Sequence, residues 1–120
     1  MKVLVVDDSA SMRMIVKRTL KQAGFDGLDF SDAADGLEGL KQLDEVKPDL
    51  VLCDWNMPNM NGIDFLRKAR EDGNLVKFGF VTTESTTEMR QAAREAGAQF
   101  LIAKPFNADT FQKALRSVIG

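Results

Sequence analysis

The stretch VLVVDDS, residues 3–9, decides the fold. Its first four residues are apolar and mostly β-branched, which is typical of a strand buried on both faces of a parallel sheet. Two adjacent aspartates, Asp7 and Asp8, end the run. The stretch LVLCDWNMP, residues 50–58, repeats the pattern and ends its apolar run at Asp54. Buried strands that end on carboxylates predict that a positive charge belongs at this edge of the sheet.

Short apolar runs alternate with longer amphipathic stretches along the rest of the chain. We expect strands at residues 3–6, 27–31, 50–53, 77–81 and 100–103, and helices at residues 9–23, 35–45, 62–71, 85–97 and 107–118. This alternation favours right-handed βαβ crossovers and a parallel sheet. The predicted fold class is α/β, a doubly wound five-stranded parallel sheet in a three-layer αβα sandwich, with residues 1–120 forming a single domain.

Local signals place the helix ends and faces. Ser9 or Ser11 can cap the first helix, and STTE at residues 85–88 is typical of a capping box at the start of the fourth. In the second helix, the leucines at positions 37, 40 and 43 are expected on one inward face, while the glycines at 36 and 39 weaken the helix locally.

Composition excludes several classes of function. With 16 Lys and Arg against 18 Asp and Glu, the net charge is -2, which argues against nucleic acid as the main partner. No apolar stretch approaches a membrane span, so we expect no membrane insertion. Cys53 is the only cysteine and no histidine is present, which excludes an internal disulfide, His-dependent nucleophilic catalysis and His-ligated zinc. We therefore expect a cytoplasmic protein.

The polar residues at the strand ends suggest one site. In open α/β sheets, ligands bind beyond the carboxyl ends of the strands, where the strand order reverses. If the order is the flavodoxin-like 2-1-3-4-5, this edge collects Asp7, Asp8, Asp54, Thr82 and Lys104. Three clustered carboxylates must take up either protons or a cation, and oxygen ligands without His or thiolate favour Mg²⁺ as that cation. Thr82 and Lys104 can then bind phosphate oxygens, and an aspartate can act as a nucleophile towards phosphorus.

Four motifs together resemble the receiver domain of the response-regulator family. They are VDDS at residues 6–9, DWNMPNMNG at 54–62, VTTE at 81–84 and KPF at 104–106, and DWNMP in particular is similar to CheY-type chemotaxis receivers. The resemblance implies that Asp54 is the phosphoacceptor for a histidine kinase. It implies Mg²⁺ ligation by Asp8, Asp54 and the backbone carbonyl of Asn56, with Asp7 acting partly through water.

The resemblance also assigns supporting roles. Lys104 would pair with the phosphoryl group, and a cis Lys104–Pro105 peptide would aim the lysine inward. Thr82 would form a hydrogen bond with that group, and Asn56 and Glu84 would tune its lifetime. The chain would be a stand-alone switch with self-catalysed phosphotransfer and autodephosphorylation rather than an enzyme. Its output would be protein binding through the 85–118 face, with the flagellar motor switch as a candidate target in chemotaxis.

One position departs from the family, and two other functions stay open. The family often has an aromatic residue three positions before the lysine, but here that residue is Leu101, and Phe100 precedes it on the opposite face of the strand. The alternatives are a pseudo-receiver, which binds partners without ever accepting phosphate, and a Mg²⁺-dependent phosphohydrolase. Such hydrolases commonly place an acid two residues after the nucleophile, and the stretch Asp7-Asp8-Ser9 lacks that spacing.

Overall fold

A computed structural model describes residues 1–119 and confirms the predicted fold class. Five parallel strands form one sheet in the order β2-β1-β3-β4-β5. Residue 120 of the expected domain lies outside the described residues. The elements are β1 (Lys2–Val6), α1 (Ala10–Gln22), β2 (Asp29–Ala33), α2 (Gly36–Val46), β3 (Leu50–Cys53), α3 (Gly62–Glu71), β4 (Lys77–Thr82), α4 (Thr87–Ala96), β5 (Phe100–Ala103) and α5 (Ala108–Ile119).

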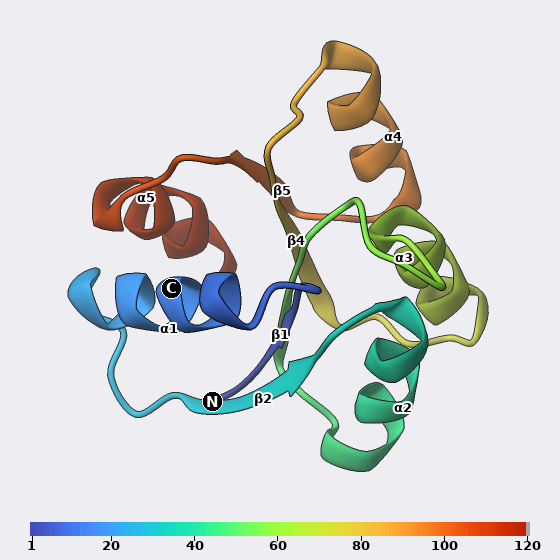
Figure 1. The fold of residues 1–120 in the computed structure, drawn as a ribbon, viewed down its shortest axis with the longest axis horizontal. Coiled ribbons are helices and arrows are strands. Elements are labelled where there is room, and N and C mark those ends of the chain that lie inside the picture. The colour runs from blue at the N-terminus through green and yellow to red at the C-terminus, as the bar shows by residue number, and fades with distance from the viewer. Residues whose placement is uncertain (120) are drawn as a thin grey trace.

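The sheet separates two hydrophobic cores. Figure 1 shows α1 and α5 on one face of the sheet and α2, α3 and α4 on the other. Successive residues of a strand point to opposite faces, so in β1 Val3 and Val5 pack towards α1 and α5, while Leu4 and Val6 pack towards the other helices. Because both faces are covered, the central strands β1 and β3 are almost entirely apolar.

The strand register brings the polar strand ends to one edge. Val6 of β1 pairs with Cys53 of β3, so Asp7 and Asp54 both follow the last paired residues. At the same edge, Thr82 of β4 pairs with Ala103 of β5, and Lys104 directly follows Ala103. The order reverses at β1, which pairs with both β2 and β3. The expected site therefore lies at the point of reversal.

Two predicted elements had wrong boundaries. Strand β2 covers Asp29–Ala33 rather than residues 27–31, because Gly27 has a φ of 70° and pairing with β1 runs from Asp29 to Ala33. Helix α4 begins at Thr87 because Thr86, not Ser85, is its N-cap: the Thr86 hydroxyl accepts a hydrogen bond from the Met89 N–H at 3.1 Å.

The inward face of α2 also differs from the prediction. Leu37 is 53% exposed, so it does not share the inward face with Leu43. Instead, Gly36 and Gly39 are buried there, and each lets a neighbour approach closely. A Cβ atom at Gly36 would lie 2.6 Å from the Met60 side chain, and one at Gly39 would lie 2.8 Å from the Phe65 ring. The glycines thus seat α2 against the loop before α3 and against α3 itself.

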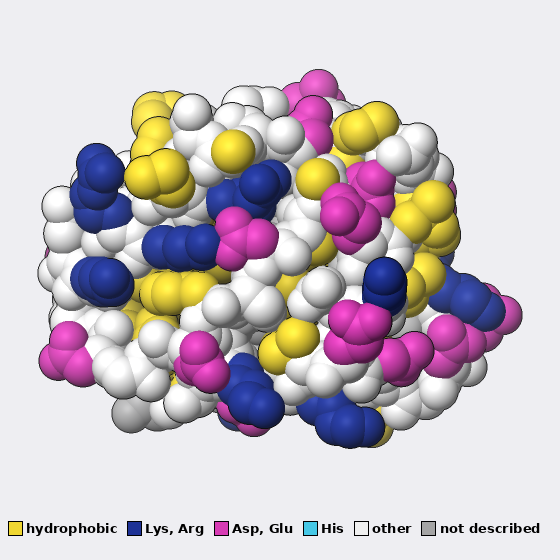
Figure 2. All heavy atoms as spheres, turned by 60° about the horizontal axis from the view of Figure 1, so that its bottom comes forward, with side chains coloured by type: hydrophobic (Ala, Val, Ile, Leu, Met, Phe, Trp, Pro, Cys, Tyr) yellow, Lys and Arg dark blue, Asp and Glu magenta, His cyan; other side chains and the backbone are white. Residues whose placement is uncertain are grey.

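The surface carries both signs of charge. Figure 2 shows Lys and Arg side chains interspersed with Asp and Glu side chains over the face that it presents. Within residues 1–119, no helix combines the length and the apolar character that crossing a membrane requires.

Asp35 joins α2 to the loop between β3 and α3. Its carboxylate accepts hydrogen bonds from the Glu38 N–H at 2.9 Å and from the Asn59 side-chain amide at 2.7 Å. Asp35 is only 7% exposed, and these two bonds, the first above all, lower the pKa of its carboxyl below the ordinary value of 3.8. The ionised form is therefore the one that stabilises the fold.

Replacing Asp35 by Ala should lower the free energy of unfolding by about 1–2 kcal/mol at pH 7, the usual cost of a lost cap. The pKa of the Asp35 carboxyl is lower in the folded than in the unfolded protein. The stability difference between wild type and Asp35→Ala is therefore largest above the unfolded pKa and disappears as pH falls through the folded pKa. Urea unfolding of wild type and Asp35→Ala at several pH values measures this. Asp44→Ala, which removes an exposed carboxylate from the same helix, is the control. A pH-independent loss would contradict the prediction.

Candidate functional site

Three carboxylates meet at the reversal point of the sheet. Oxygen atoms of Asp7, Asp8 and Asp54 all lie within 4.8 Å of one another. Asp7 is 4% exposed, the Asp54 side chain is largely buried and Asp8 is exposed. The structure thus brings together three residues that stand 47 positions apart at their extremes. The cluster opens to solvent on the side of Asp8.

Lys104 reaches this cluster from the end of β5. Its ammonium nitrogen lies 3.1 Å from Oδ2 of Asp7 and 3.6 Å from Oδ2 of Asp54, and the side chain is largely buried. The peptide between Lys104 and Pro105 is cis, as the family resemblance implied. One ammonium group faces three carboxylates, so the site is left with an excess of negative charge.

Burial and the neighbouring charges together shift the pKa of the Asp54 carboxyl. Burial raises the pKa of Asp54, and the neighbouring charges of Asp7 and Asp8 add to this, whereas Lys104 and the Trp55 N–H oppose it without cancelling it. Next to it, burial raises the pKa of the Cys53 thiol well above its usual range. Cys53 is therefore a neutral packing residue and not a thiolate ligand.

The residues present fit a small divalent cation. The donor atoms are carboxylate oxygens, which Mg²⁺ prefers, and the local charge is negative. Asp8 is exposed, and within residues 1–119 its carboxylate makes no hydrogen bond or ion pair, so it is free to bind a ligand. Asn56 follows Asp54 by two residues and is exposed in the loop between β3 and α3.

Thr82 and Glu84 lie beside the cluster at the end of β4. Thr82 is fully buried, and within the described residues its hydroxyl oxygen accepts a single long hydrogen bond, from the Glu84 N–H at 3.5 Å. Its carbonyl accepts a hydrogen bond from the Lys104 N–H at 2.8 Å, which ties the ends of β4 and β5 together. Glu84 itself is exposed. Among residues 1–119, the Thr82 hydroxyl thus donates no hydrogen bond.

The loop after Asp54 is held by contacts that the sequence reasoning missed. The Trp55 N–H donates to Oδ1 of Asp54 at 2.8 Å, and the Gly62 N–H donates to the Trp55 carbonyl at 2.8 Å. A Cβ atom at Gly62 would lie 2.2 Å from the Asp54 carbonyl oxygen, so only glycine fits there. The NG pair at residues 61–62 is the signal that could have indicated this close approach.

Arg13 and Asp32 were also missed. The Arg13 guanidinium donates from Nη1 to the Asp7 carbonyl at 2.5 Å and from Nε to Oδ2 of Asp32 at 3.0 Å. The ammonium of Lys17 binds the other oxygen of Asp32. Nothing in the sequence distinguishes Arg13 from the other cations of α1.

Leu101 and Phe100 face opposite sides of the sheet, as predicted. Leu101 packs with the core under α3 and α4, and Phe100 with the core under α1 and α5. The Phe100 ring covers Gly79 of the neighbouring strand so closely that a Cβ atom there would lie 2.1 Å from it. Phe100 is therefore fixed over the sheet and does not replace the aromatic residue missing at position 101.

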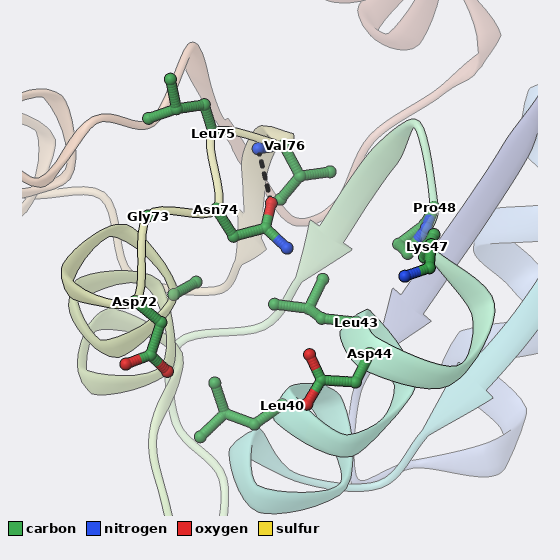
Figure 3. A pocket seen from close by; sticks show the side chains of 11 residues that line it. Leu40, Leu43, Asp44, Lys47, Pro48, Asp72, Gly73, Asn74, Leu75 and Val76 are labelled. Atoms are coloured by element: carbon green, nitrogen blue, oxygen red, sulfur yellow. Dashed lines mark hydrogen bonds between the residues drawn. The ribbon is translucent and has the colours of Figure 1, made fainter.

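Two cavities lie away from the acidic cluster. One, of about 490 Å³, lies between α2 and α3 at the opposite edge of the sheet, where Leu40, Leu43, Leu75 and Val76 line it (Figure 3). Another, of about 640 Å³, is an open groove between α4 and α5 over β5, with Leu101 and Lys113 among its lining residues. Neither cavity is lined by Asp7, Asp8 or Asp54.

The crowding of carboxylates predicts that Asp54→Asn is more stable than wild type at pH 7 when a chelator removes divalent cations. Since the folded pKa of Asp54 is raised, its ionised form costs stability above that pKa, and the difference vanishes as pH falls below the unfolded pKa. Thermal unfolding between pH 3 and 8 measures this, with the exposed Asp26→Asn as control. A less stable Asp54→Asn under chelation would contradict it.

Comparison with known proteins agrees with this geometry. The family model described as response regulator receiver domain matches residues 3–116. The chain is 37% identical to chemotaxis protein CheY1 of Helicobacter pylori, and the match covers the whole chain and 98% of that protein. It is 40% identical to chemotaxis protein CheY-3 of Vibrio cholerae, and that match covers 98% of this chain and 91% of the relative. The crystal structure of Vibrio cholerae CheY4 superposes with a TM-score of 0.85 at 37% identity and covers 98% of each chain. The chain therefore belongs to the response regulator receiver domain family.

Proposed function

We propose that residues 1–120 form one receiver unit that works in the cytoplasm as a phosphorylated switch. Asp54 accepts a phosphoryl group from a histidine kinase, and the phosphorylated chain binds a downstream protein. One observation carries this proposal: the largely buried Asp54 carboxylate lies close to two further carboxylates and to the Lys104 ammonium. A divalent cation would neutralise the excess negative charge of these groups and so allow a phosphoryl group to approach Asp54.

Phosphoryl transfer needs little more than these groups. The P–N bond of the donor phosphohistidine breaks, a P–O bond to Asp54 forms, and the imidazole nitrogen takes a proton. An ionised carboxylate needs no general base, so the transfer depends on positioning and charge neutralisation. A Mg²⁺ ion held by Asp8, Asp54 and the Asn56 carbonyl, with Asp7 acting partly through water, would supply positive charge against the phosphoryl oxygens.

The other residues bind the product and govern its loss. Lys104 and the free Thr82 hydroxyl would hold phosphoryl oxygens, one by charge and the other by a hydrogen bond. In autodephosphorylation, water attacks phosphorus, the P–O bond to Asp54 breaks, and inorganic phosphate leaves a carboxylate behind. Asn56 and Glu84 are exposed and follow Asp54 and Thr82 by two residues each, and in this proposal they would control the approach of that water.

The output surface in this proposal is the 85–118 face. Helix α4 buries only one side chain, Ala93, so it is weakly attached and can shift at low cost when Thr82 moves. The open groove between α4 and α5 provides room for a partner peptide. The relatives are chemotaxis proteins, so we propose a role in chemotaxis, with the flagellar motor switch as a candidate target.

Intact-mass measurement after incubation with acetyl phosphate and Mg²⁺ tests the acceptor. Wild type should gain one phosphoryl group, Asp54→Asn should gain none while keeping its fold, and the exposed Asp26→Asn should behave as wild type. Incorporation into Asp54→Asn at the wild-type rate would overturn the assignment. If wild type gains no phosphoryl group, the pseudo-receiver alternative is correct.

Hydrogen exchange with and without Mg²⁺ and beryllofluoride, an acyl-phosphate mimic, tests the output face. We expect altered exchange in the loop after β4, in α4 and in β5, because Thr82 and Lys104 lead directly into them. Helix α2, which is capped by Asp35, serves as the internal control. Equal changes in α2 and α4 would contradict a directed output.

A further inference from the structure

Arg13 contacts the acidic site at a point where the sheet no longer supports it. The Asp7 N–H donates to the Ala33 carbonyl at 3.0 Å, which is the last hydrogen bond between β1 and β2. The Asp7 carbonyl, which belongs to the peptide linking Asp7 to Asp8, lies beyond that last bond. It accepts a hydrogen bond from Nη1 of Arg13 at 2.5 Å. The guanidinium therefore restrains the peptide plane that joins two proposed cation ligands.

Asp32 fixes Arg13 in place. Asp32 pairs in register with Val5 of β1, so its position is set by the sheet. Its Oδ2 accepts from Nε of Arg13 at 3.0 Å, and the Arg13 side chain is only 17% exposed. Held in this way, the planar guanidinium presents a second donor to the Asp7 carbonyl, which a single ammonium group cannot do with the same geometry.

Asp7 and Asp8 differ in how their carboxylates are held. Both carboxylate oxygens of Asp7 have partners, the Ser9 N–H at 2.9 Å and the Lys104 ammonium at 3.1 Å. In residues 1–119, the exposed Asp8 carboxylate has no such partner. The direction of Asp8 therefore depends on its backbone, and Arg13 holds the peptide that precedes it.

We propose that Arg13 is a positioning residue for the cation site: held by Asp32, it orients the Asp7–Asp8 peptide so that the Asp8 carboxylate faces Asp54 before a cation arrives. The inference rests on the proposed function. Removing a group that orients a metal ligand commonly lowers metal affinity by about 10–100-fold. An Arg13 that acted only as a nearby positive charge would have the opposite effect, because its removal would tighten cation binding.

Lys17 provides a matched control. It carries the same charge and binds the same Asp32 carboxylate, but it does not contact Asp7. Mg²⁺ titration of the apo protein, followed by fluorescence of Trp55 beside Asp54, measures affinity without turnover. We expect Arg13→Met to weaken Mg²⁺ binding about tenfold or more, and Lys17→Met to leave it within about twofold, because partly exposed charges are screened. Asp32→Asn and Arg13→Lys should also weaken binding.

A second measurement separates positioning from general damage. With acetyl phosphate as donor, Arg13→Met should need more Mg²⁺ for half-maximal phosphorylation yet reach close to the wild-type rate at saturation. Unchanged or tighter Mg²⁺ binding in Arg13→Met, or an equal effect of Lys17→Met, would overturn the inference. Should Arg13→Met not fold, Arg13→Lys and Asp32→Asn decide, and wild-type affinity in both overturns it. If wild type binds no Mg²⁺, the proposed function itself fails.

Discussion

The structure depends on one electrostatic constraint, the meeting of three carboxylates and one ammonium group at the edge of a parallel sheet. Coulomb repulsion between carboxylates this close is large in a partly dry site, and Lys104 offsets only part of it. The fold tolerates the arrangement because the buried strands β1 and β3 hold Asp7 and Asp54 rigidly at their ends. The site therefore holds a charge imbalance that ligands can remove.

The same constraint connects ligand binding at the acidic cluster to helices α4 and α5. Lys104 leads into α5, and Thr82 leads into the loop before α4, so ligands that attract these two groups act directly on two neighbouring elements. Helix α4 is held mainly through Ala93, whereas α2 is held by a cap, two close-packed glycines and Leu43. In the proposed function, the weakly packed side of the molecule is therefore the side on which the site would act.

Much of the fold and of the site could be predicted, and the failures have physical causes. The apolar runs before Asp7 and Asp54 are unambiguous because buried parallel strands leave no room for polar residues. The edge strand β2 is half-exposed, so its apolar pattern is weak, and only pairing with β1 defines its start. Leu37 follows the helical period but lies outward, because the inward positions are occupied by glycines that admit Met60 and Phe65. Arg13 could not be found, since its role arises from a contact with a backbone carbonyl.

The contact of Phe100 with Gly79 has a consequence for how this sheet can vary. The ring occupies the volume that any side chain at position 79 would need. Positions 79 and 100 are therefore sterically coupled: a methyl group added at position 79 would require the Phe100 ring to move or to be replaced by a smaller side chain.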